Sequence, residues 1–251
     1  MANSSSGDSV VDRVVRVLEA FPEGVSSLPL TELAERSGLP LTSAHRLVRQ
    51  LADHRLLEQA PGGKVQLGLR LWELVNRNSP ILLLRQAALP FMDDIHQVLN
   101  QNVNLGVLQG DDVLFVERLS RRGSVANRAK VAGRMPVHVS SAGIALMSGQ
   151  PRAAQNAYLA RFRDPAGKVD ADSVRRLLAT AAERGYAELA GVVDPETWGI
   201  AVPIEDRQRR TVAAIGVVVP LAEVRIHQIV PALRTAARGI GRQLGSLTPA
   251  P

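Results

Sequence analysis

The residues best suited to chemistry in this chain lie on one side of a short predicted helix that follows a Gly38-Leu39-Pro40 turn. At helical spacing, the other side of this helix is apolar, with Ala44, Leu47, Val48 and Leu51. The polar side offers hydroxyls, an imidazole, an amide and two guanidinium groups, from Thr42, Ser43, His45, Arg46, Arg49 and Gln50. Such a helix can pack by its apolar side and present donors and cations to a DNA groove.

These side chains differ in what they can contact. Arginine donates two hydrogen bonds to guanine or binds phosphate, and hydroxyls suit phosphates or base edges, so we expect DNA contacts from Thr42, Ser43, Arg46 and Arg49. A merely solvated helix face is the alternative for the two arginines. The role of His45 stays open, since this residue either contacts DNA or packs beneath the helix. Lys64, in a predicted hairpin, is expected to contact the phosphate backbone.

The distribution of charge supports the same interpretation. Residues 1–39 hold three basic and six acidic residues, a net charge of −3, whereas residues 40–77 hold six basic and three acidic residues, a net charge of +3. The sign therefore changes where the polar helix begins. A polyanion would meet the basic half.

The elements around this helix predict a winged helix-turn-helix. Residues 9–21 form a first helix, with Val11, Val14, Val15, Leu18 and Phe21 as its buried stripe. Thr31 is expected to start the second helix, and Pro40 lies near the first turn of the third. Extended runs on either side of Pro61-Gly62-Gly63 predict a small β-hairpin over residues 58–67.

Composition excludes several classes of protein. The 251-residue chain has no cysteine, which removes disulfides, thiolate metal sites and cysteine nucleophiles. No two histidines have metal-ligand spacing, so neither a metal nor a cofactor is expected. The longest apolar run, Ile81–Leu84, is far too short to span a bilayer, and the N-terminus lacks the pattern of a secretory signal. We expect a cytoplasmic protein with no membrane partner.

The rest of the chain predicts a second, α+β domain. A break at Asn78-Ser79-Pro80 marks the boundary, and a long helix over 81–100 follows, with a kink or restart at Pro90. Paired extended runs alternate with helices, which is typical of an antiparallel sheet covered by helices. Strands are expected at 103–109, 113–119, 126–131, 186–190, 199–204 and 212–220, and helices at 140–147, 153–162, 172–184 and 222–244.

One helix start in this second domain is a candidate ligand site. Small residues, Ser140, Ser141, Ala142 and Gly143, open a helix whose free N–H groups can hold a carboxylate, with tight packing of the helix start as the alternative. Arg134 can neutralise an acid ligand or lie at the surface. His138 beside two serines superficially suggests a hydrolase, but no Gly-x-Ser-x-Gly motif is present and no acid is placed to orient the histidine. We expect no catalytic residues and no enzymatic activity.

Two arginine clusters are expected to decorate loops or hairpin tips. The first comprises Arg121, Arg122, Arg128 and Lys130, and the second comprises Arg207, Arg209 and Arg210.

From Ser9 to Leu244 the chain resembles the IclR family of bacterial transcription regulators. The similar segments are residues 30–51 (LTELAERSGLPLTSAHRLVRQL), 133–147 (GRMPVHVSSAGIALM), 184–189 (RGYAEL) and 199–220 (GIAVPIEDRQRRTVAAIGVVVP). The resemblance implies a winged helix-turn-helix joined to a GAF-like effector domain. It also implies operator binding as a dimer or tetramer and a response to small organic acids.

The resemblance also extends the candidate ligand site. It places Glu188, Glu196, Trp198 and Gly199 near a second pocket wall, where Trp198 either closes over an aromatic ligand or packs in the core. The expected ligand-binding set is Arg134, His138, Ser140, Ser141, Ala142, Glu188, Trp198, Gly199 and Ile200. The chain departs from the family at Leu41, where a basic or polar residue is common, at Arg55, where glycine is usual, and at Gly199, where some members carry cysteine.

These expectations combine into a ligand-responsive DNA-binding regulator, with repression as its mode. Residues 9–68 form the winged helix-turn-helix domain, 69–80 a linker helix, and 81–246 the effector-binding and oligomerisation domain. Its partners are double-stranded operator DNA, a small carboxylate or aromatic-acid effector, and further copies of itself. The alternative is a ligand-sensing module that acts through protein contacts without useful DNA binding.

Overall fold

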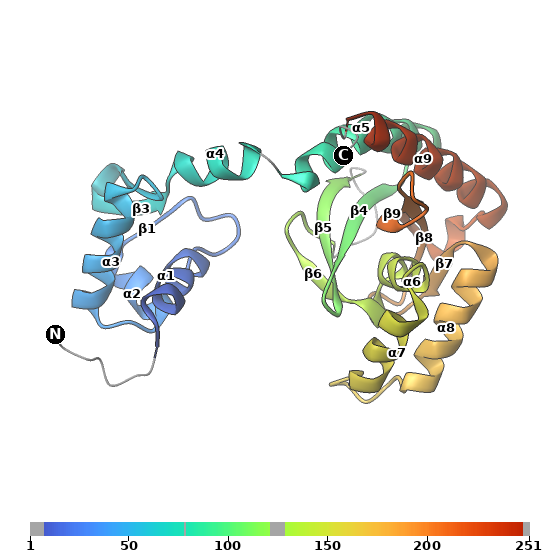
Figure 1. Cartoon of the computed structure of the whole chain (residues 1–251), viewed down its shortest axis with the longest axis horizontal. Coiled ribbons are helices and arrows are strands. Elements are labelled where there is room, and N and C mark those ends of the chain that lie inside the picture. The colour runs from blue at the N-terminus through green and yellow to red at the C-terminus, as the bar shows by residue number, and fades with distance from the viewer. Residues whose placement is uncertain (1–7, 78, 121–128, 248–251) are drawn as a thin grey trace. The chain divides into compact units, whose positions relative to one another are not determined.

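The computed structural model describes residues 8–77, 79–120 and 129–247. The chain divides into two compact units, and the division falls between Ser79 and Pro80 (Figure 1). Among the described residues, no helix combines the length and the apolar character that crossing a membrane requires.

The N-terminal unit is a winged helix-turn-helix, as predicted. Its elements are α1 (Val10–Glu19), β1 (Ser27–Leu28), α2 (Leu30–Ser37), α3 (Leu41–Asp53), β2 (Leu57–Ala60), β3 (Lys64–Leu67) and α4 (Leu69–Arg77). The predicted hairpin is the antiparallel pair β2–β3, with Leu57 opposite Leu67. Strand β1 adds to the outer edge of β3, giving the order β1-β3-β2. The sequence did not predict β1, because two residues carry no period-2 pattern.

The core of this unit lies between the three helices and the hairpin, and it corrects the predicted stripe of α1. Val17 is fully buried, whereas Val11 is 69% and Val15 is 43% exposed. Helix α1 is apolar on more than one side, so its periodicity alone does not say which side packs against α2 and α3. The packed side carries Val14, Val17 and Leu18.

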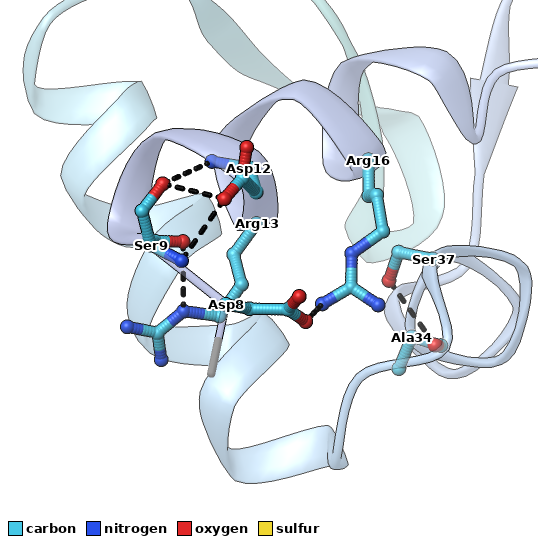
Figure 2. Close-up of polar contacts among 7 residues, drawn as sticks. All are labelled: Asp8, Ser9, Asp12, Arg13, Arg16, Ala34 and Ser37. Carbon is cyan, nitrogen blue, oxygen red and sulfur yellow. Dashed lines mark hydrogen bonds and ion pairs between the residues drawn. The ribbon is translucent and has the colours of Figure 1, made fainter. Parts of the chain in front are cut away.

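Local hydrogen bonds fix where α1 begins. Ser9 and Asp12 form a capping box, in which the Asp12 N–H donates to Ser9 Oγ (3.1 Å) and the Ser9 N–H donates to Asp12 Oδ2 (3.0 Å) (Figure 2). The hydrogen bonds from Ser9 lower the pKa of Asp12. Helix α2 starts at Leu30 after Pro29 without a side-chain cap, so the prediction that Thr31 starts it was wrong.

The C-terminal unit is built on one antiparallel sheet with the strand order β6-β5-β4-β9-β8-β7. Its strands are β4 (Asn102–Gln109), β5 (Asp112–Leu119), β6 (Arg134–Pro136), β7 (Ala187–Ala190), β8 (Thr197–Glu205) and β9 (Thr211–Pro220). Its helices are α5 (Pro80–Leu99), α6 (Ser141–Ser148), α7 (Arg152–Arg161), α8 (Ala171–Arg184) and α9 (Ile226–Leu247).

Each face of this sheet has its own core. Helices α5 and α9 run along one face, and α6, α7 and α8 cover the other (Figure 1). Because side chains alternate along a strand, β8 contributes to both cores: Ile200, Val202 and Ile204 pack toward α5 and α9, and Ala201 packs toward α6. The predicted α+β class is therefore correct.

Two predictions about this unit need correction. Residues 129–131 are not a strand, and the strand at this edge is β6, whose Met135 pairs with Val113; residues 126–128 lie outside the described residues. The helix α5 continues through Pro90 without a restart.

Loss of the capping box of α1 should loosen that helix. Ser9→Ala removes the hydroxyl that accepts the Asp12 N–H, which costs about 1 kcal/mol for an N-cap. We expect hydrogen exchange of the first amides of α1 to accelerate roughly fivefold, measured by NMR. Ser26→Ala, in an exposed loop, is the control. Unchanged protection in Ser9→Ala would mean that packing, and not the cap, holds this end.

Candidate functional sites

Among the described residues, the side chains on the polar side of α3 have no hydrogen-bond or ion-pair partner. Thr42, His45, Arg46, Arg49 and Gln50 are exposed, while Ser43 is half-buried. The opposite side supplies Ala44, Leu47 and Leu51 to the core, where none is more than 6% exposed. The division of the helix into a packed and an exposed face is therefore as the spacing predicts.

The hairpin adds a second wall beside α3. A groove runs between α3 and the β2–β3 hairpin, and its lining includes His45, Arg49, Gln59 and Gly63. The turn of the hairpin needs left-handed backbone at Gly62 (φ 75°) and Gly63 (φ 72°), and exposed Lys64 follows directly. The turn therefore places a lysine at the tip of the wing, with an imidazole and an arginine facing the groove behind it.

Charge pairing distinguishes α3 from its surroundings. Arg16 binds Asp8 (2.6 Å) and Arg36 binds Glu32 (2.9 Å), so basic residues of the acidic half are neutralised within their own unit. In the part of the chain that the structure describes, no carboxylate lies within 4.0 Å of the guanidinium of Arg46 or Arg49. These two cations are available to an external anion.

The end of α3 explains one departure from the family. Arg55 has φ 57°, in the left-handed region that glycine adopts most easily. The Arg55 carbonyl also approaches Gly68 closely, because a methyl group on Gly68 would lie 2.1 Å from the carbonyl oxygen. The left-handed turn and the close approach of Gly68 bring the chain from α3 back into the hairpin.

The second candidate site is a pocket on the α6 face of the C-terminal sheet. It draws residues from β4, β5, β6, α6, β7, β8 and β9, and the segment between β7 and β8 supplies Val192 and Val193. The empty space inside it, including the opening to solvent, is about 580 Å³. The lining comprises Asn104, Phe115, Ala129, Met135, Val139, Ser140, Ser141, Ala142, Leu189, Val192, Val193, Thr197, Gly199, Gly216, Val217 and Val218.

Two serines of this pocket lie at the start of α6. Ser140 is the N-cap, and its hydroxyl accepts the N–H of Gly143 (3.3 Å). The N–H groups of Ser141 and Ala142, in the first turn, have no acceptor within the helix. Gly199 faces Ser141 so closely that a methyl group there would lie 2.8 Å from Ser141 Oγ. Glycine at this position leaves space beside the N-terminus of α6.

Of the expected ligand-binding residues, four line this pocket: Ser140, Ser141, Ala142 and Gly199. Trp198 and Ile200 flank Gly199 on β8, so their side chains point to the opposite face and pack in the α5–α9 core. The expectation that Trp198, Gly199 and Ile200 share one wall overlooks this alternation.

Three further expected residues have other partners. Arg134 is exposed and donates to Gln109 Oε1 (2.9 Å). Glu188 accepts from Arg184 (3.0 Å) in a groove beside α8. His138 is 7% exposed, and its ring meets Phe162 edge-on with centroids 4.9 Å apart. None of the three lines the pocket.

The surroundings of His138 correct one argument about catalysis. An acid does lie near it, since Asp164 Oδ1 is 3.8 Å from His138 Nε2. Ser140 Oγ is engaged with Gly143, and among the described residues no hydrogen bond joins His138 to Ser140 or Ser141. Nor do the described residues contain a group of three His, Asp or Glu side chains able to hold a metal ion.

Sequence reasoning missed most of the apolar lining and two buried polar residues, Asn104 and Thr197. Asn104 is 5% exposed between Val103 and Leu105, and a polar residue between two apolar residues of an expected strand was the available signal. Thr197 donates to the Asp194 carbonyl (2.9 Å), which ties the β7–β8 segment to the pocket.

Comparison with known proteins gives matches over both units. The model of the IclR helix-turn-helix domain matches residues 10–61, and that of the bacterial transcriptional regulator IclR C-terminal domain matches residues 81–242. The glycerol operon regulatory protein of Streptomyces coelicolor is 30% identical, over 94% of this chain and 96% of its own.

Solved structures are similar as well. An IclR homologue from Microbacterium hydrocarbonoxydans, complexed with 4-hydroxybenzoate, is 39% identical with a TM-score of 0.87, covering 95% of this chain and 100% of that one. An IclR homologue from Microbacterium sp. strain HM58-2 is 37% identical with a TM-score of 0.61, covering 97% and 100% of the two chains.

The burial of His138 predicts a pH dependence of stability. Burial lowers the pKa of His138, and the attraction of Asp164 opposes only part of this shift. Below the unfolded-state pKa of about 6.5, the unfolded chain therefore binds more protons than the folded chain. Stability is expected to be greatest above that pH and to fall as the pH drops from about 7.5 to about 5.5.

Urea unfolding across this pH range measures the effect. His138→Gln should flatten the acid side of the profile, while His227→Gln, at an exposed position, should leave it unchanged. If His138→Gln loses stability as steeply as the wild type, burial does not hold His138 neutral.

Proposed function

This chain belongs to the IclR family of bacterial transcriptional regulators, and we propose that it is a repressor whose operator binding responds to a small aromatic carboxylate. In this proposal, residues 9–68 bind DNA and residues 69–80 link the two domains. Residues 81–246 sense the effector and oligomerise. The observation that carries it is an exposed helix face with two unpaired arginines in one unit of a chain whose other unit holds an apolar pocket. Such a protein acts in the cytoplasm, where bacterial DNA lies.

In this proposal α3 is the recognition helix. Recognition helices lie in the major groove with their N-terminal residues at base edges, which suits Thr42, Ser43 and Arg46. Arg49 and His45 face the groove toward the hairpin, and Lys64 at its tip suits a backbone phosphate. Leu41, 50% exposed at the start of α3, would add an apolar contact where relatives often carry a polar one.

Self-association is supported by α4. Leu69 (64%), Trp72 (63%) and Val75 (56%) are all exposed on this helix, and a tryptophan so exposed is common at interfaces. We therefore place a subunit contact at α4. A dimer sets two recognition helices at half-sites one turn of DNA apart, which requires a roughly palindromic operator.

The pocket chemistry favours an acid with a flat apolar body. Its walls are apolar and include Phe115, while the start of α6 offers two N–H groups and the Ser141 hydroxyl to a carboxylate. The homologue from Microbacterium hydrocarbonoxydans, which is 39% identical, was crystallised with 4-hydroxybenzoate. Asn104 and Thr197 are further polar residues of the lining.

The effector can regulate only if it binds one arrangement of the subunits more tightly than another. A module that senses the acid but acts through protein contacts is the competing proposal. DNA binding separates the two.

Loss of Arg46 should weaken DNA binding. Arg46→Ala removes one contact to a base or a phosphate, worth about 1–3 kcal/mol, so we expect a complex with the best genomic fragment that is roughly 5- to 150-fold weaker in gel shifts. Arg36→Ala, whose guanidinium is paired with Glu32, is the charge-matched control. Tight binding by Arg46→Ala would remove α3 from the interface and favour the protein-contact alternative.

Filling the mouth of α6 should abolish effector binding. Ser141→Leu puts a bulky side chain beside Gly199, so we expect the thermal shift produced by 4-hydroxybenzoate to disappear while DNA binding persists. Ser246→Leu, at an exposed position of α9, is the control. A shift that survives Ser141→Leu would place the ligand elsewhere. If neither 4-hydroxybenzoate nor benzoate shifts the melting temperature of the wild type, the aromatic-acid proposal is refuted.

A further inference from the structure

Helix α9 carries charge of one sign. Its 22 residues include Arg234, Arg238 and Arg242 and no aspartate or glutamate. All three are exposed, and a spacing of four residues sets them on one face of the helix. Solvated protein surfaces normally intersperse both signs, so this face differs from an ordinary one.

The β8–β9 hairpin brings further arginines to the same place. An open groove between the hairpin and α9 is lined by Arg207, Arg209, Arg234, Arg238 and Arg242, with Glu205 and Asp206 as its acids. The hairpin and α9 are in close contact at Arg207, because a methyl group on Gly245 of α9 would lie 2.2 Å from Arg207 Nε. Arg207 therefore does not merely decorate a hairpin tip but lies along α9, one turn beyond Arg242.

The acids of the groove are already engaged. Asp206 accepts from Arg210 Nε (2.7 Å) and from the N–H groups of Gln208 and Arg210 (both 2.9 Å). Glu205 is 3.1 Å from Arg209 Nε. Within 8–77, 79–120 and 129–247, no carboxylate lies within 4.0 Å of the guanidinium groups of Arg207, Arg238 or Arg242.

One arginine has a structural role and bounds the groove. Arg234 donates to the Arg184 carbonyl at the end of α8 and lies over the Tyr186 ring, 5.9 Å from its centroid. Val202, Pro203, Ala237 and Gly241 supply the apolar part of the lining. The groove thus combines a cationic rim with an apolar floor.

The charge of the whole chain points to the same unit. Residues 1–79 hold nine basic and nine acidic residues, so the entire net charge of +6 belongs to residues 80–251. Attraction of an anion to this unit therefore does not depend on the DNA-binding unit.

We propose that this groove binds a small organic polyphosphate, as a second regulatory site separate from the effector pocket. Guanidinium groups bind phosphate oxygens in pairs. Arg238 Nε donates to the Arg234 carbonyl (3.3 Å), which leaves its two terminal nitrogens, together with Arg207 and Arg242, without a carboxylate partner among the described residues. The row from Arg234 to Arg242 is about 12 Å long, which suits a compact polyanion. Tight duplex binding instead takes roughly 6–10 phosphate contacts. The two sites lie on opposite faces of the sheet, so both can be occupied together.

Calorimetry on the full chain tests the proposal, with inorganic tripolyphosphate and ATP as probes in about 50 mM salt. Arg238→Gln/Arg242→Gln should weaken binding of both probes at least tenfold and leave the 4-hydroxybenzoate response unchanged. Arg152→Gln/Arg225→Gln removes the same charge from exposed positions outside the groove and should change affinity less than about twofold.

Three outcomes would overturn the proposal. The first is no binding of either probe by the wild type at millimolar concentration. The second is equal weakening by both double variants, which would indicate diffuse attraction to the positive unit. The third concerns binding of a random DNA duplex. If Arg238→Gln/Arg242→Gln lowers the salt dependence of duplex binding but leaves the affinity for tripolyphosphate unchanged, the groove contacts DNA instead.

Discussion

The alternation of side chains along β8 is the constraint on which the C-terminal unit depends. Thr197, Gly199 and Ala201 face α6, whereas Trp198, Ile200 and Val202 face α5 and α9. A strand buried on both faces must satisfy two cores at once, so a shift of one residue would exchange pocket and core. Glycine at 199 leaves room at the helix start, because a methyl group there would lie 2.8 Å from Ser141 Oγ and would displace that hydroxyl. The pocket beside α6 exists because this strand presents small and polar residues on one face only.

The acidic and the basic side chains of the chain differ in whether they have local partners. Many acids of the chain bind locally, in the capping box of α1, in the Asp206 turn, or in pairs such as Arg36–Glu32. The cations of α3 and α9 have no such partners among the described residues. Unpaired guanidinium groups in rows on exposed helix faces are a means of binding anions in water. The proposed carboxylate site works differently, since it relies on N–H groups and hydroxyls inside an apolar pocket, where one charge needs only a few well-placed donors.

These arrangements fit a regulator with several inputs. Under the proposed function, binding to DNA, self-association and recognition of a small acid fall to α3, α4 and the α6 face in turn. The groove along α9 lies on the remaining face of the sheet, so it does not compete with the pocket for space. Its position on a hairpin and a long helix means that a bound polyanion would tie two elements together, and such cross-linking is a plain route to coupling with subunit arrangement.

The sequence by itself determined the local structure, including helix α3 and its exposed polar face. Helical spacing, Pro40 and the two glycines at 62 and 63 are short-range signals, so α3 and the hairpin were predictable to within a few residues. The sequence also indicated four pocket residues. Only the tertiary structure decided which side of α1 packs, that Trp198 and Ile200 turn away from the pocket, and that Arg207 joins the row on α9. Each of these depends on contacts between segments far apart in the chain, such as α9 with β8, and such contacts leave no periodic trace in the sequence.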